Sequence, residues 1–205
     1  KTEMAILLHT CCGPCLGGSY PILEKTAGSG NTAIFWENPN IHPFVEHHQR
    51  LLSCQKMADV LGLQLIAGDA SYGLERFLLA LKGDFGPGRC ATCYRMRLNA
   101  VAQAAARLSF EAFTTTLLIS PYQNHELLIS VGEEAGKAAG VKFHYTDFRP
   151  GFRSSHETAR KNELYRQKYC GCIFSEHDRF RNDKKFLNPF LSSGVIMNET
   201  PQKRS

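Results

Sequence analysis

The chain has 205 residues, of which 43% are hydrophobic and 21% are charged, a balance that is typical of soluble globular proteins. This length suits one sizeable α/β domain, and no run approaches the roughly 20 apolar residues of a membrane-spanning helix, so we expect one domain without a membrane partner. The net charge of +5 is a moderate excess that permits an RNA partner but does not by itself indicate one.

Short β-rich runs alternate with longer amphipathic segments along most of the chain. In chain order we predict a strand at 5–9, a helix at 14–27, a strand at 32–36, a helix at 44–61, a strand at 63–66, helices at 72–82 and 92–108, a strand at 110–118, a helix at 125–139 and a strand at 141–145. Because strands alternate with helices, the pattern predicts parallel βαβ units and hence a single doubly wound, mostly parallel sheet of the α/β class.

The pattern loosens after Asp147, where a loop rich in Gly, Pro, Arg and Ser precedes a predicted helix at 156–167. The motif YCGC follows at 169–172, and residues 181–205 carry no clear signal. We therefore predict a metal-binding catalytic domain over residues 1–180 and an irregular C-terminal tail over residues 181–205.

Seven of the eight cysteines fall into three separated motifs. The opening segment lacks the long apolar core of a secretory signal, so we expect a cytosolic protein, in which clustered cysteines bind metal more often than they form disulfides. Ligands of a doubly wound fold collect at the carboxyl ends of the strands, and a helix N-terminus favours thiolates, so a metal centre is expected at this edge of the sheet. The three motifs are Cys11, Cys12 and Cys15 after the first strand, Cys90 and Cys93 at a helix start, and Cys170 and Cys172 near the C-terminus.

The number and spacing of these cysteines favour iron. A structural zinc site uses four ligands, usually from two closely spaced knuckles, whereas these motifs lie about 75 to 80 residues apart. Seven thiolates divide into four for a cubane iron–sulfur cluster and three for a second metal with an open position. A redox dithiol at C-x-x-C and a structural zinc for part of the set are the alternatives. Cys54 falls on a predicted buried helical stripe, and we interpret it as a structural residue.

Five longer motifs together resemble one known family. The likeness covers residues 5 to about 180, in order, and the family is that of the QueH-type epoxyqueuosine reductases; Cys54 and the segment after Arg179 have no counterpart in its motifs. The motifs are HTCCGPC at 9–15, ENPNIHP at 37–43, RCATCYRMRL at 89–98, FTTTLLISPYQNHELL at 113–128 and YRQKYCGCIFS at 165–175.

This resemblance implies reduction of epoxyqueuosine to queuosine at the wobble position of tRNA, the last step of queuosine biosynthesis. It also implies a modified HUP/PP-loop-like domain that carries a [4Fe–4S] cluster beside a second mononuclear metal, expected to be iron, and an external electron donor. All seven motif cysteines would be the ligands, with their division between the two groups left open.

Removal of an epoxide oxygen to leave an alkene needs two electrons and two protons. The cluster would deliver the electrons and an adjacent open-site metal would act as a Lewis acid. No G-x-G-x-x-G fingerprint follows the first strand, so no nicotinamide or flavin is expected. The candidate proton donors, each of which could also serve a structural role, are Tyr122, His125, Asp147 and His9.

A tRNA partner would meet arginines and aromatic rings near the motifs. The wobble base lies in a single-stranded loop, so it can turn into a pocket at little cost in pairing energy. Tyr94, Tyr122 and Phe152 could stack on the modified base, although Tyr94 also fits the core stripe of its helix. The candidate RNA contacts are Arg89, Arg95, Arg97, Arg149 and Arg153, with Arg160 and Lys161 beyond them; such charges are also common on a solvated face.

Two other functions are open to the same sequence. A tRNA thiolase of the PP-loop type would need a Ser/Gly-rich phosphate loop after the first strand, where CCGPC stands at 11–15. A zinc-stabilised RNA-binding module without redox activity would be colourless and would depend on zinc for its folding.

Overall fold

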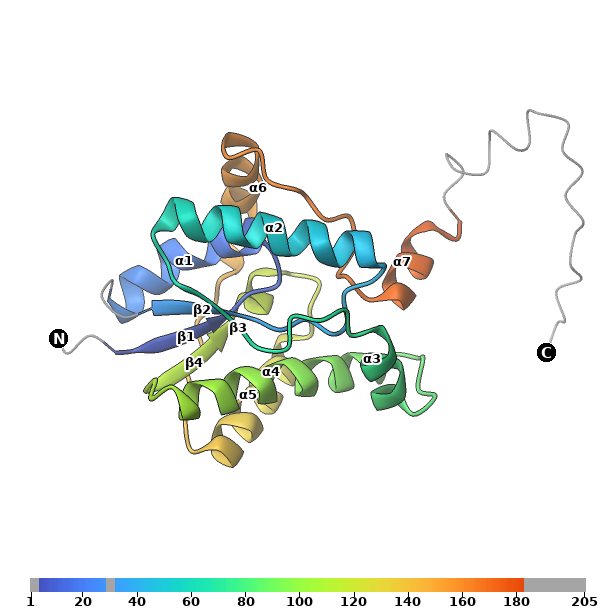
Figure 1. Ribbon diagram of the computed structural model, residues 1–205, viewed down its shortest axis with the longest axis horizontal. Coiled ribbons are helices and arrows are strands. Elements are labelled where there is room, and N and C mark those ends of the chain that lie inside the picture. Colours follow the sequence, from blue (N-terminus) through green and yellow to red (C-terminus); the bar gives the residue numbers. More distant parts are fainter. Residues whose placement is uncertain (1–3, 29–31, 183–205) are drawn as a thin grey trace, which may run out of the picture.

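The computed structural model describes residues 4–28 and 32–182 and forms an α/β fold around one parallel sheet (Figure 1). The sheet has five strands in the order β3-β2-β1-β4-β5, and all four neighbouring pairs are parallel. The strands are β1 Ile6–His9, β2 Thr32–Trp36, β3 Leu65–Ala67, β4 Ala112–Thr115 and β5 Lys142–Phe143.

Helices cover both faces of the sheet. On one face lie α1 and α2, and on the other lie α4 and α5 (Figure 1). The second-to-last element, α6, packs against α1, and α7 follows the CGC motif. The helices are α1 Gly13–Ala27, α2 Phe44–Leu61, α3 Leu74–Leu81, α4 Arg89–Arg107, α5 His125–Ala139, α6 Phe152–Lys161 and α7 Ile173–Phe180, with the 3-10 turns η1 Thr116–Ile119 and η2 Arg149–Gly151.

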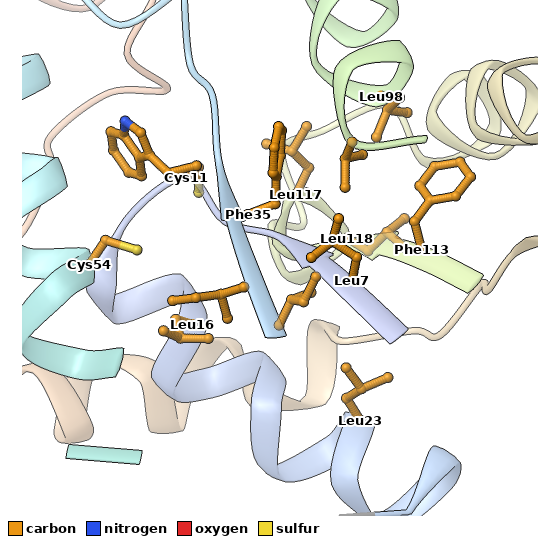
Figure 2. Packing of buried hydrophobic residues seen from close by; sticks show 14 of the residues in the cluster. Leu7, Cys11, Leu16, Leu23, Phe35, Cys54, Leu98, Phe113, Leu117 and Leu118 are labelled. Atoms are coloured by element: carbon orange, nitrogen blue, oxygen red, sulfur yellow. The ribbon is translucent and has the colours of Figure 1, made fainter. Parts of the chain in front are cut away.

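The core fills the space between the central strands and these helices (Figure 2). Every residue of β1 and β4 is buried, as expected for strands that are covered on both faces. Leu7 of β1 and Phe113 of β4 pack with Leu16 and Leu23 of α1 and with Leu98 of α4. This packing holds the strands in place, and the site is built at their carboxyl ends.

The strand order places a topological switch point between β1 and β4. From β1 the chain moves outward through β2 and β3, and it returns to the other side of β1 to form β4 and β5. In such folds the crevice for ligands lies beyond the carboxyl ends of the two strands that flank the switch point. The residues that follow β1 and β4 here are Cys11 and Thr116, and they are in contact: the backbone N–H of Cys11 donates to Thr116 Oγ1 at 3.2 Å.

The predicted α/β class and the doubly wound parallel sheet are confirmed. Several predicted bounds were wrong, and two segments differ most. The run predicted as a strand at 110–118 is a strand only over Ala112–Thr115, because Thr115 Oγ1 accepts the backbone N–H of Leu117 and starts a 3-10 turn. The helix predicted at 156–167 begins at Phe152 and ends at Lys161.

One helix of the structure, α7, was not predicted at all. Residues 183–205, which make up nearly all of the predicted tail, lie outside the described residues. Among the residues that are described, none of the helices has the length and apolar character required to cross a membrane.

Candidate metal centre

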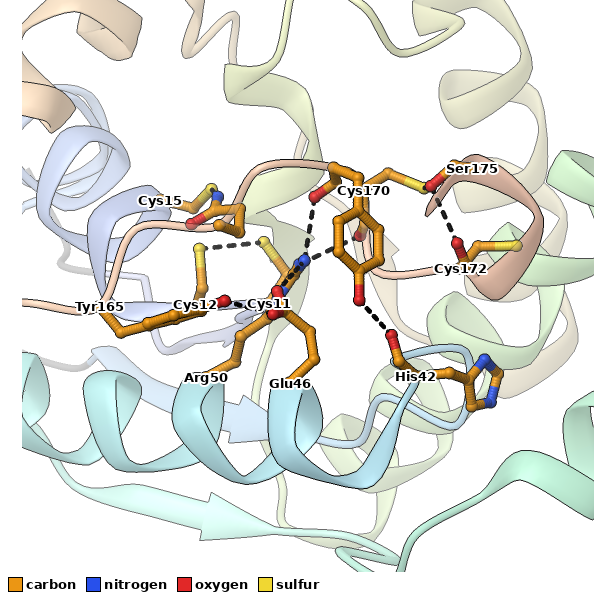
Figure 3. A network of polar contacts seen from close by, with 12 residues as sticks. Cys11, Cys12, Cys15, His42, Glu46, Arg50, Tyr165, Cys170, Cys172 and Ser175 are labelled. Atoms are coloured by element: carbon orange, nitrogen blue, oxygen red, sulfur yellow. Dashed lines mark hydrogen bonds and ion pairs between the residues drawn. The ribbon is translucent and has the colours of Figure 1, made fainter. Parts of the chain in front are cut away.

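The first cysteine motif forms a compact group of three thiols at the end of β1. The sulfur atoms of Cys11, Cys12 and Cys15 all lie within 4.8 Å of one another, and those of Cys11 and Cys12 are 3.8 Å apart (Figure 3). Cys12 is the N-cap residue of α1, so the group sits where free backbone N–H groups and the helix dipole favour negative charge. We call these residues the triad.

The triad is arranged to hold a thiolate. Hydrogen bonds with Cys12 and Cys15 lower the pKa of the Cys11 thiol well below its usual range, and the charge of Arg97 and the hydroxyl of Thr116 act in the same direction. Burial raises the pKa of Cys12, and hydrogen bonding to Cys11 raises that of Cys15. A metal cation in place of these protons would offset the negative charge of the three thiolates.

The other two motifs meet around one pocket. Cys90 and Cys93 occupy the first turn of α4, and Cys170 and Cys172 precede α7; all four line a pocket whose empty volume is about 380 Å³, part of it open to solvent. Cys93 and Cys172 are buried and pack with Phe77, whereas Cys170 is exposed. These four residues are called the pocket cysteines below. Two motifs whose cysteines lie 77 residues or more apart in sequence therefore line the same pocket.

Burial favours the protonated thiol at three of the pocket cysteines, Cys90, Cys93 and Cys172, while no cation is bound. Burial raises the pKa of Cys93 to about 12, and burial also raises the pKa of Cys90 and of Cys172. A metal would have to displace these protons, so binding and deprotonation are coupled.

A buried arginine connects the triad with the pocket cysteines. The guanidinium of Arg97 approaches Cys93 Sγ at 3.8 Å, donates to Asn38 Oδ1 at 2.7 Å and lies 3.4 Å from His9 Nε2. Asn38 Nδ2 in turn donates to the carbonyl of Thr10, next to the triad. The arrangement forms a rigid polar wall in which every side chain has a partner.

Asn40, two residues further along the same loop, is different. It is 1% exposed and lines the pocket, yet neither its amide nitrogen nor its amide oxygen has a partner among the described residues. Across the pocket, the buried Tyr94 donates its hydroxyl hydrogen to Gln123 Oε1. Buried amides without partners are uncommon and costly, so the Asn40 amide is suited to a molecule that enters the pocket.

The CGC motif is held in place by a second buried arginine. Arg50 of α2, which is 1% exposed, pairs with Glu46 and donates to the backbone carbonyls of Tyr169 at 2.9 Å and Cys170 at 3.1 Å (Figure 3). The hydroxyl of Tyr165 donates to the second oxygen of Glu46. Gln167 Nε2 reaches Cys15 Sγ at 3.5 Å, so this segment also touches the triad.

The predicted proton donors lie at different distances from this centre. His9 is buried at the end of β1, where its Nδ1 is 2.9 Å from Thr115 Oγ1. His125 Nε2 lies 3.1 Å from the carbonyl of Ser120, Asp147 is paired with Arg149 at 2.7 Å, and Tyr122 is 86% exposed. None of the four lines the pocket. Their catalytic roles stay predictions.

Some of the arginines predicted to contact RNA are exposed, and others already form ion pairs or hydrogen bonds within the protein. Arg95 and Arg153 are exposed, whereas Arg149 is paired with Asp147. Arg89 lies at the pocket, where it pairs with Asp178 at 2.7 Å. Arg97 is 2% exposed, and its guanidinium is directed into the polar wall described above.

Arg50, Glu46, Asn40 and Gln123 were missed as site residues. Glu46 and Arg50 stand eight and four residues before Cys54, on the helix face that the sequence marks as buried. A charged pair on a buried stripe is the signal that could have identified them. For Asn40 and Gln123 the sequence holds no signal beyond their motifs.

The chemistry of the donor set fits soft metals. All seven ligand candidates are sulfurs, and in the described part of the chain the triad is the one group of three or more His, Cys, Asp or Glu atoms within 4.8 Å. Thiolates select iron–sulfur clusters, zinc or copper(I) over hard cations. The residues therefore fit a thiolate-bound soft metal, of which an iron–sulfur cluster is one kind.

Comparisons with known proteins point to one family. The sequence profile described as "Epoxyqueuosine reductase QueH" matches residues 6–178. A protein of this name from Dehalococcoides mccartyi is 37% identical over 175 residues, covering 85% of this chain and 94% of that protein. The protein of this name from Thermotoga maritima is 33% identical, with 85% and 91% covered, and the one from Helicobacter pylori is 38% identical, with 83% and 49% covered.

Proposed function

The chain belongs to the QueH family of epoxyqueuosine reductases and is an enzyme of that oxidoreductase family, and we propose that it reduces epoxyqueuosine to queuosine in tRNA, the last step of queuosine biosynthesis. The observation that supports this proposal is that two distant cysteine motifs line one pocket, while the third forms a compact group of thiols at the end of β1. The tRNA partner, the wobble position and the cytoplasmic location are parts of the same proposal.

We propose that the seven cysteines hold a [4Fe–4S] cluster and a second, mononuclear iron. A single ion with four sulfur ligands at about 2.3 Å holds them roughly 3.8 Å apart, which matches the compact triad. A cubane holds its thiolates farther apart because four iron atoms lie between them. It suits the pocket cysteines, no three of which lie within 4.8 Å of one another. The triad would leave one coordination position open.

The reaction must break both carbon–oxygen bonds of the epoxide, form the carbon–carbon π bond and release the oxygen as water. It consumes two electrons from an external one-electron reductant and two protons. When bound, the iron groups supply electron transfer and Lewis acidity. The chain itself supplies a partly enclosed pocket, the Asn40 amide and the Tyr94–Gln123 pair on its walls.

Protons and RNA would reach the pocket from its rim. Tyr122 precedes the pocket residue Gln123, and its exposed ring meets Phe152 edge-on with a centroid distance of 6.0 Å. We propose that these rings stack on nucleotides of the anticodon loop, with the exposed Arg95 and Arg153 near phosphates. Tyr122, His125 and Asp147 remain our proposed proton donors.

The direct test is anaerobic purification followed by reaction with tRNA that carries epoxyqueuosine. We expect a brown protein with about five iron atoms and four sulfides per chain, and with dithionite as reductant we expect the modified nucleoside to lose one oxygen atom by mass spectrometry. A colourless protein that contains zinc, binds tRNA and leaves the nucleoside unchanged would support the zinc-stabilised RNA-binding module instead.

A second prediction concerns Asn40. Replacing Asn40 by Leu removes a buried donor and acceptor that lack partners in the ligand-free protein, so the melting temperature should stay the same or rise. If the amide hydrogen-bonds to the contents of the pocket during turnover, kcat/KM should fall about 5- to 150-fold, with iron content unchanged.

Asn38→Leu is the matched control for this substitution, since Asn38 is equally buried but fully bonded. That variant should lose thermal stability. Unchanged kcat/KM in Asn40→Leu would contradict the role of the Asn40 amide.

A further inference from the structure

Residues 162–172 join α6 to α7 without regular secondary structure, and we call this segment the strap. It carries Cys170 and Cys172 to the pocket and passes the triad, where Gln167 contacts Cys15. A segment without a helix or strand has no ladder of backbone hydrogen bonds to hold it. Its position must come from contacts with other parts of the protein.

The central contact of the strap is the Arg50 guanidinium. Arg50 Nη2 donates to the carbonyl of Tyr169 and Arg50 Nη1 donates to the carbonyl of Cys170, at 2.9 and 3.1 Å. The guanidinium also lies 5.6 Å from the centroid of the Tyr169 ring. Both carbonyls belong to adjacent residues, so the planar fork of the guanidinium fixes the direction of the chain at the CGC motif.

Glu46 orients this fork from the preceding turn of α2. Its Oε1 accepts from Arg50 Nε at 2.7 Å and lies 2.6 Å from Nη2, and its other oxygen accepts the hydroxyl hydrogen of Tyr165. Glu46 is 7% exposed. The Glu46–Arg50 pair is therefore bonded to the strap at two places. Glu46 accepts a hydrogen bond from Tyr165, and Arg50 donates to the carbonyls of Tyr169 and Cys170.

The loop after β2 completes the attachment. The backbone N–H of His42 donates to the carbonyl of Gly171 at 2.7 Å, and the hydroxyl of Tyr169 donates to the carbonyl of His42. Gly171 has a φ of +114°, and a Cβ there would lie 3.0 Å from Ile41 and 3.2 Å from Arg50 Nη1. The close approach of strap and loop at this point needs glycine.

We propose that Arg50, oriented by Glu46, is the positioning residue that latches the strap and thereby sets Cys170 and Cys172 against the cysteines of α4. An exposed Glu–Arg pair with this spacing would do little more than support its helix. Here the pair is buried, and Arg50 also donates to main-chain carbonyl oxygens 119 and 120 residues away. The latch acts on metal ligands through the backbone that carries them.

The test uses the double variant Glu46→Leu/Arg50→Met in the complete chain, purified without air. Apolar residues of similar size usually preserve the stability of a protein when they replace a buried ion pair, so the melting temperature should stay near that of the wild type. Hydrogen exchange at the His42 amide and across residues 162–172 should accelerate at least about tenfold, which corresponds to about 1.4 kcal/mol. Iron content should fall to less than half.

Arg50→Lys provides a second variant that keeps the charge but lacks the fork. It should show faster hydrogen exchange at the same amides and an altered electron paramagnetic resonance signal of the reduced protein. The proposal can therefore still be tested if the double variant does not fold. The control is Arg76→Met, because Arg76 pairs with Glu37 at 3.0 Å and with Asp69 at 3.1 Å but does not contact the strap.

Exchange in the strap that equals the wild type in both Arg50 variants would overturn the latch. Faster exchange with unchanged iron and an unchanged spectrum would overturn its positioning role. The part that concerns iron rests on the proposed function, whereas the exchange measurement does not. A wild-type protein that shows the exchange pattern but leaves epoxyqueuosine unreduced would therefore refute the function and leave the latch in place.

Discussion

Replacing any one of the seven motif cysteines by alanine is expected to remove iron from the anaerobically purified protein, whereas Cys54→Ala should keep it. The triad variants should lose about one iron per chain and keep sulfide, because their sulfurs are spaced for one ion. The pocket variants should lose about four iron atoms together with the sulfide, because a cubane depends on all its ligands. Iron and sulfide are measured on the same samples.

Cys54 is the internal control because it shares the residue type and differs in its surroundings. It is fully buried in α2, burial raises the pKa of its thiol well above the usual range, and it does not line the pocket. Its replacement removes one buried sulfur, at a cost of about 1 kcal/mol of stability. Full iron content after loss of Cys170 or Cys172 would break the proposed grouping, and sulfide loss from the triad variants would reverse the assignment.

The regular part of the fold could be predicted because its signals are local. A hydrophobic pattern within each segment predicts the buried strands β1 and β2 and the amphipathic helices α2, α4 and α5. The resulting βαβ units then determine a parallel sheet. A parallel sheet predicts that ligand-binding residues lie at the carboxyl ends of its strands, and this is where the triad lies. Local pattern and global fold agree here, as expected for a well-determined sequence.

The segments that were predicted poorly depend on contacts that local patterns do not contain. The run TTTLLI after Phe113 is β-branched and apolar like a strand, but the hydroxyl of Thr115 bonds to the backbone two residues on and turns the chain. The sequence of the strap shows no regular spacing of hydrophobic residues. Its path depends on one arginine side chain that reaches main-chain carbonyls 119 and 120 residues away.

The candidate site shows the same division between local and distant information. The seven cysteines were identifiable because metal ligands are defined by residue type and spacing. The side chains that orient them, Arg50 and Arg97, were not, since a charged residue in a helix is more often a solvated one. Only the fold places Arg97 between Cys93 and Asn38.

Gly13→Ala is expected to disturb the triad by steric means alone. Gly13 is the first residue of α1, between Cys12 and Pro14, and it faces the middle of α2. A Cβ at this position would lie 2.2 Å from the backbone oxygen of Ser53 and 2.5 Å from its hydroxyl oxygen. Because the nearest atom belongs to a helix backbone, the two helices must move apart by about an ångström, and overpacking of this kind costs about 1–3 kcal/mol.

The melting temperature of Gly13→Ala should therefore fall by roughly 2–12 °C, and the iron attributed to the triad should be lost while sulfide is kept. Gly86→Ala is the matched control, because a Cβ there would meet only Asp84 Oδ1 at an ordinary 3.5 Å. Normal iron and stability in Gly13→Ala would show that the N-terminus of α1 can shift without moving its sulfurs. The close docking of α1 on α2 would then not be what holds the triad together.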